Sequence, residues 1–163
     1  MPTLSTWTAY GLCRPLSQGR QKMSEFYQYF KENMDALGLA APETLFANAT
    51  TALATATALA TQIDKFGSRV TLMEIVGAGT RLEKLAVVGA CSAAFYAGAV
   101  VGSIAVATGR VLANGTSMSD VMLLLTRNQL DREWMRTCIQ RHPGLYTSNH
   151  PGKMLYRHWQ HTA

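Results

Sequence analysis

The sequence predicts an all-α protein: a small helical bundle with a central small-residue hydrophobic helix able to insert in a membrane. Two observations lead to this expectation. Residues 85–109 contain no charged side chain, and the apolar residues outside this stretch recur every three or four positions, which is the spacing of one helix face. A chain of 163 residues fits a single domain that buries its own core. Within that domain (1–163) we expect an irregular N-terminus over 1–20, helices within 21–141 and an irregular C-terminal tail over 142–163.

A first helix is predicted over residues 21–37. Its apolar side chains share one face: Met23, Phe26, Tyr27, Phe30, Met34 and Leu37. Gly38 suits the left-handed residue that follows many helices, and Pro42 suits the first turn of the next one.

A second helix is predicted over residues 43–76. The stretch 44–63 is uncharged and biased toward alanine and threonine, and its alanine content and length favour a helix over a strand. Its leucines and alanines gather on one face, and Thr50, Thr57 and Thr61 lie along one flank. In a membrane assembly this flank is a candidate pore lining. In a soluble bundle the same helix covers the surface.

The central helix is predicted over residues 81–113. Gly77-Ala78-Gly79 interrupts the preceding helix, and Thr80-Arg81-Leu82-Glu83 matches a capping box. As a helix, the uncharged residues 85–109 rise roughly 37 Å, enough to cross a hydrocarbon core about 30 Å thick.

Small residues recur at every fourth position of this helix and create a face that a second backbone approaches closely. The candidate helix-packing residues are Gly89, Ala90, Ala93, Ala94, Gly98, Gly102 and Gly109. Such a face serves helix association in a membrane, but it also suits the central helix of a tightly packed soluble bundle. Both interpretations remain open from the sequence.

The last long helix is predicted over residues 119–141, with Ser117 or Ser119 and Asp120 at its start. Apolar side chains predicted to face the core are Val121, Leu124, Leu125, Leu130, Trp134 and Cys138. His142-Pro143-Gly144 ends the helix.

Composition argues against several functions. The net charge is +5, but the basic residues are dispersed, whereas nucleic-acid binding needs a clustered basic face. Cys13, Cys91 and Cys138 are too scattered for a disulfide framework, and no carboxylate or cysteine joins the histidines of the tail to make a metal site. No P-loop, nucleophile elbow or HExxH motif occurs. We therefore expect no cofactor, no metal, no nucleic acid and no enzymatic activity.

The N-terminus lacks the basic and apolar regions of a secretory signal peptide. We therefore expect synthesis in the cytoplasm and, if the protein reaches another membrane, a route other than general secretion.

The small-residue helix, following an Ala/Thr-rich helix, resembles the glycine-zipper pore-forming effectors of bacterial type VI secretion systems. Gly89, Ala93, Ala94, Gly98 and Gly102 carry this resemblance. It implies a secreted antibacterial toxin that inserts into the inner membrane of a recipient cell and forms a small ion-conducting pore, which dissipates the membrane potential. It also implies a ring-shaped secretion tube protein as carrier, a cognate immunity protein, contact with membrane lipid and self-association.

Two alternatives belong to other classes. One is a non-toxic membrane-associated or structural helical protein that oligomerises through its small-residue face. The other is a soluble helical adaptor. A delivered pore should poison a cell mainly from one side of the membrane, whereas a scaffold or an adaptor should be harmless from both.

Overall fold

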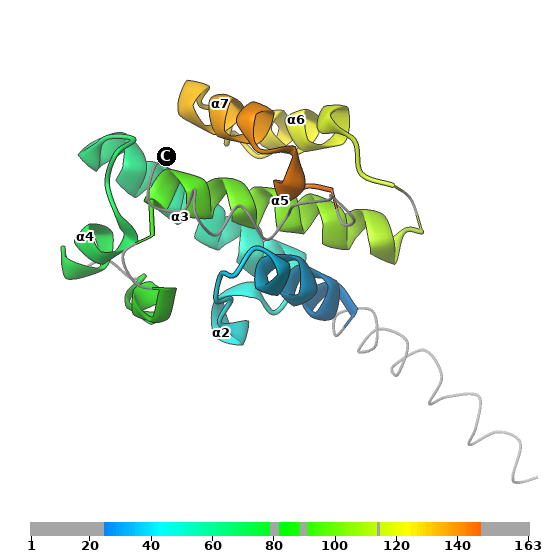
Figure 1. Cartoon of the computed structure of the whole chain (residues 1–163), viewed down its shortest axis with the longest axis horizontal. Helices are drawn as coiled ribbons and strands as arrows, with labels where there is room; N and C mark the ends of the chain where they lie inside the picture. The colour runs from blue at the N-terminus through cyan, green and yellow to red at the C-terminus, as the bar shows by residue number, and fades with distance from the viewer. Residues whose placement is uncertain (1–24, 79–81, 89–90, 114, 148–163) are drawn as a thin grey trace, which may run out of the picture.

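The computed structural model describes residues 25–78, 82–88, 91–113 and 115–147, and these form helices packed around α5 (Ala93–Val111) (Figure 1). The other elements, in chain order, are a first helix over 25–36, α2 (Glu43–Phe46), α3 (Ala49–Phe66), α4 (Leu72–Gly77), the 3₁₀ helix η1 (Glu83–Val88), α6 (Met118–Arg127), α7 (Glu133–Arg141) and the 3₁₀ helix η2 (Pro143–Leu145). Within the described ranges the only extended pairing is an isolated antiparallel bridge between Thr71 and Ser92. The all-α prediction is confirmed.

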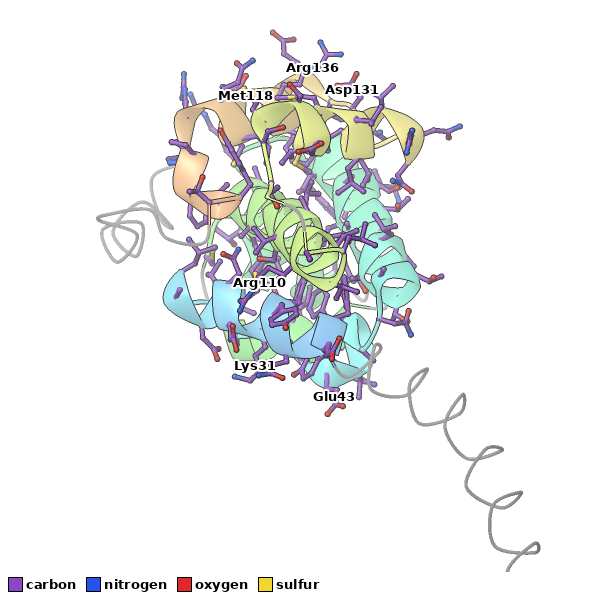
Figure 2. All side chains as sticks on the ribbon, turned by 90° about the vertical axis from the view of Figure 1, so that its right-hand side faces the viewer. Lys31, Glu43, Arg110, Met118, Asp131 and Arg136 are labelled. Atoms are coloured by element: carbon purple, nitrogen blue, oxygen red, sulfur yellow. The ribbon has the colours of Figure 1, made fainter. Side chains whose placement is uncertain are left out.

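Helices surround α5 on several sides. In Figure 1, α6 and α7 lie along one side of α5 and α3 along another, and α5 contacts α3, α6, α7 and η2. Figure 2 looks along α5 from its C-terminal end, with the first helix on the side opposite α6 and α7. We call the first helix, α3, α6, α7 and η2 together the cover of α5.

The first helix ends as the sequence predicts. Gly38 has a φ of 75°, and the Leu39 amide donates to the Met34 carbonyl at 2.9 Å, which is the longer bond of a Schellman motif. This turn buries Leu37 and Leu39. The predicted start of this helix at residue 21 lies outside the described residues.

The single helix predicted over 43–76 is wrong, because the chain breaks twice there. The Asn48 side chain accepts a hydrogen bond from the Thr51 amide at 2.9 Å and begins α3 as its N-cap. Gly67, with a φ of 99°, ends α3. Thr71 and Glu74 then form a capping box that begins α4, and these bonds to Thr71 lower the pKa of the Glu74 carboxyl.

The central helix begins twelve residues later than predicted, since residues 83–88 form η1 and α5 begins at Ala93. Ser92 is its N-cap and accepts from the Phe95 amide at 3.4 Å. The backbone before it pairs with residues 70–72: Ala93 donates to Val70, and Leu72 donates to Cys91. Thr80 and Arg81, which carry the predicted start, lie outside the described residues.

The helix predicted over 119–141 is two helices. Ser117 and Asp120 form a capping box that begins α6, which confirms one of the two predicted caps. Gln129 adopts a φ of 55°, and the Leu130 amide donates to the Leu125 carbonyl at 2.9 Å. This Schellman turn directs Leu130 into the core, where it is fully buried, before α7 begins at Glu133.

Candidate functional site

α5 is the candidate site because it is the one helix, among the described residues, long and apolar enough to cross a membrane. Its apolar surface is turned inward: all residues from Ala93 to Ala107 are buried, and 78% of the most hydropathic stretch is enclosed by the rest of the chain. Only the last turn, with Thr108 and Arg110, is exposed. The chain's own helices thus shield this span.

The small residues of α5 pack against α7 and η2. A Cβ added to Gly98 would stand 2.7 Å from the Cys138 Sγ, and one added to Gly102 would stand 2.4 Å from the Leu145 carbonyl oxygen. The second distance is far too short for any side chain, and its partner is backbone. The glycines therefore allow η2 to lie directly on the helix.

The other predicted helix-packing residues differ in burial, and two of them are not described. Ala93 and Ala94 are buried in the first turn of α5, and Gly109 is partly exposed in its last turn. Gly89 and Ala90 lie outside the described residues. The close backbone approach that the sequence predicts is thus made within one chain at Gly98 and Gly102, so association between chains through this face requires α7 and η2 to leave it.

A buried amide joins three segments at the same place. The Asn33 side chain donates to the Ser103 Oγ at 2.8 Å and to the Leu145 carbonyl oxygen at 2.9 Å. Asn33 is 4% exposed and Ser103 is not exposed at all. We call these two hydrogen bonds the Asn33 latch, because they tie the first helix, α5 and η2 together beside Gly102.

Two surface clusters connect the cover around α5. Arg110, at the end of α5, pairs with Glu32 at 2.6 Å and lies over the Tyr29 ring at 3.9 Å. Asp64 of α3 accepts from the Arg132 guanidinium at 3.0 Å and from the Trp134 indole at 3.1 Å. Such exposed pairs each contribute little to the free energy of unfolding, so they affect the relative positions of the helices more than the stability of the fold.

The candidate pore-lining threonines lie on the outer face of α3. Thr50, Thr57 and Thr61 are exposed, and the hydroxyls of Thr57 and Thr61 each donate to the carbonyl four residues earlier at 2.9 Å. The opposite face of α3, with Leu59 and Ile63, is buried. In this arrangement the three threonines point away from α5 and toward solvent.

Reactive groups are few in the described ranges. They contain no cluster of three metal-ligating side chains. Cys91 and Cys138 are buried, and burial raises the pKa of the Cys138 thiol to about 12, which keeps it protonated at neutral pH. His142 is the one tail histidine that is described, whereas His150, His158 and His161 lie outside.

Sequence reasoning missed the Asn33 latch and a pocket of about 460 Å³ between α7 and the first turn of α5. The lining side chains Trp134, Thr137, Cys138 and Arg141 follow the spacing i, i+3, i+4, i+7, so one face of a helix carried the signal. No local pattern identifies the partner of a single buried asparagine.

Removing the latch should destabilise the fold. Asn33→Ala leaves the Ser103 hydroxyl and the Leu145 carbonyl without this donor in an enclosed site, which costs about 1–3 kcal/mol. Urea unfolding, followed by helix content, measures the change. Gln28→Ala is the control, because Gln28 is an exposed amide on the same helix, bonded only at the surface to Glu32. Equal unfolding midpoints for the two variants would show that the latch contributes nothing.

Comparison with known proteins finds no matching protein-family model, no matching curated sequence and no matching solved structure.

Proposed function

We propose that this protein is a membrane-inserting toxin that forms a small ion-conducting pore, and that the described fold is its closed form. The observation that carries the proposal is α5, a span of membrane length that is enclosed by the chain's own helices. In the closed form the cover keeps the apolar side chains of α5 away from water, and after insertion lipid takes over this role.

The balance of interactions supports such an exchange. An apolar helix loses little hydrophobic stabilisation when it moves from a protein core to lipid, because lipid tails are as apolar as the side chains it leaves. What it gives up is specific: packing on Gly98 and Gly102, the Asn33 latch and the Arg110–Glu32 pair. The same glycine face is then available to other copies of α5.

The outer face of α3 suits the second part of the mechanism. Thr50, Thr57 and Thr61 present hydroxyls along the helix without a fixed charge among them. If α3 accompanies α5 as one wall of the assembly, this flank offers water and small ions a narrow hydroxyl-lined path. The resemblance to type VI secretion effectors adds delivery in a ring-shaped tube protein and protection by an immunity protein, both as part of the proposal.

Liposomes test the proposal directly. Purified protein is added to vesicles that hold a potassium gradient, a potential-sensitive dye and a large entrapped dextran. We expect the membrane potential to collapse while the dextran is retained, because a hydroxyl-lined path between helices passes only small ions. An undisturbed potential at saturating protein would contradict the proposal, and release of dextran would contradict the narrow path.

A second candidate function, a soluble helical adaptor, is favoured by one observation. The glycine face of α5 is already filled by Cys138 and Leu145 of the same chain, as in a permanent core. Expression in the cytoplasm and in the periplasm separates the candidates: the pore should be toxic mainly from the periplasmic side, and the adaptor from neither.

A further inference from the structure

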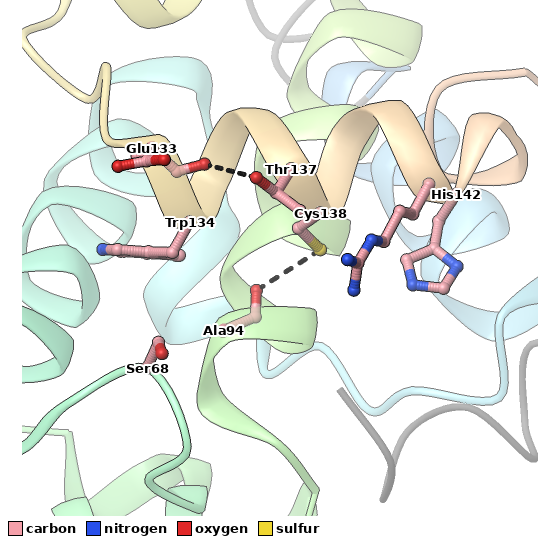
Figure 3. A pocket seen from close by; sticks show the side chains of 8 residues that line it. Ser68, Ala94, Glu133, Trp134, Thr137, Cys138 and His142 are labelled. Atoms are coloured by element: carbon pink, nitrogen blue, oxygen red, sulfur yellow. Dashed lines mark hydrogen bonds between the residues drawn. The ribbon is translucent and has the colours of Figure 1, made fainter.

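The pocket beside α7 has a shape and chemistry that the proposed pore does not use. It has a volume of about 460 Å³ and lies between α7, the first turn of α5 and the loop after α3. Figure 3 shows Trp134 and Cys138 on one wall, with Ala94 and Ser68 across from them. Glu133 and His142 mark its two ends.

The middle of the pocket is apolar and held in place. The Trp134 ring forms a wall, and its indole N–H is already bonded to Asp64 at 3.1 Å, which fixes the ring. Cys138 donates its S–H to the Ala94 carbonyl at 3.7 Å, so this thiol behaves as an apolar surface. Likewise, the Thr137 hydroxyl donates its hydrogen bond to the Glu133 carbonyl at 2.9 Å.

The positive charge is at one end only. The Arg141 guanidinium lines the pocket beside His142, whose ring meets the edge of Phe95 at 5.3 Å. Burial, and then Arg141, lower the pKa of His142, so the histidine is neutral at pH 7 and Arg141 is the cation of this end. The Glu133 carboxylate repels anions from the opposite end.

We propose that this pocket binds a small amphipathic anion, a medium-chain carboxylate, with its head on Arg141 and its hydrocarbon body against Trp134, Cys138 and Ala94. The guanidinium fork matches a carboxylate, and the fixed indole provides apolar contact at low entropic cost. From Trp134 to Arg141, seven residues of helix rise about 10 Å, close to the length of an eight-carbon chain. The inference is separate from the pore, because it concerns binding to the closed form.

Fluorescence quenching tests the site. In a Trp7→Phe/Trp159→Phe background, Trp134 is the remaining tryptophan of the chain. Titration with 8-bromooctanoate should quench its emission, because bromine quenches on contact, whereas 8-bromooctanol should bind at least tenfold more weakly. Unbrominated octanoate should reverse the quenching and inorganic phosphate should not. Equal quenching by the alcohol would show an apolar site only, and competition by phosphate would show an anion site only. Either result overturns the proposal.

Matched variants locate the head group. Arg141→Gln should weaken 8-bromooctanoate binding at least tenfold. Arg127→Gln should not, because Arg127 is an exposed arginine at the end of α6 that does not line the pocket. Glu133→Gln should tighten binding by removing the repelling charge. All three side chains are exposed, and unchanged helix content confirms folding. If Arg141→Gln and Arg127→Gln bind alike, the carboxylate does not sit on Arg141. Each outcome stands whether or not the protein conducts ions.

Discussion

Gly98→Cys is expected to form a disulfide with the native Cys138 and to switch ion conduction off until the bond is reduced. A Cβ at position 98 stands 3.6 Å from the Cys138 Cβ, within the range of about 3.5–4.5 Å found in disulfides. The bond would join α5 to α7 and keep α5 from leaving its cover. Oxidised protein should leave the liposome potential intact, and the same protein should collapse it after addition of reductant.

The crosslink also has a stability signature. Closing the loop from residue 98 to residue 138 should stabilise the fold by about 4 kcal/mol in the chain-entropy account, measured as the difference between oxidised and reduced unfolding. Cys13→Ser and Cys91→Ala in the background prevent other pairings. Gly98→Cys with Cys138→Ala is the control, because it carries the same added side chain without a partner. Conduction by the oxidised, crosslinked protein would show that α5 works without leaving α7.

The fold class was predictable because apolar spacing and alanine content are local signals, and helices form from local contacts. The breaks were not. Gln129 takes a left-handed conformation that glycine usually occupies, so nothing in the sequence marked the end of α6 as Gly38 marks the end of the first helix. At α5, the Ser92 cap lies in the segment 91–93 whose backbone pairs with residues 70–72, and that pairing is tertiary.

In the candidate site, too, the local features could be predicted from the sequence and the tertiary partners could not. The row of small residues indicated that a backbone lies on α5, but not whose backbone it is. That partner, Leu145, belongs to a tail expected to be irregular, and η2 places it on Gly102. Likewise, a periodic pattern locates a face of the first helix, but Asn33 finds Ser103 and Leu145 only when the three segments are packed.

Gly102→Leu is expected to destabilise the fold strongly. Even a methyl group there would stand 2.4 Å from the Leu145 carbonyl oxygen. This oxygen belongs to the backbone and is held by the Asn33 latch, so a change of side-chain rotamer cannot relieve the clash. Overpacking in a well-packed core costs about 1–3 kcal/mol and occasionally more, and we expect the upper end of this range here because the contacted atoms are backbone. Gly77→Leu is the control, because a Cβ at the end of α4 meets nothing within 4 Å, and its unfolding midpoint should change little.

The same variant separates the two uses of the glycine face. If α5 inserts and then associates through this face, Gly102→Leu opens the closed form and blocks association, because leucine adds apolar surface but removes the groove. Flotation with vesicles should then show more bound protein than wild type, while the potassium gradient persists. If α5 is only a core helix, the variant should unfold or aggregate without binding vesicles. Wild-type conduction by Gly102→Leu would refute the zipper, because a pore assembled through close contact at Gly102 has no room for that side chain.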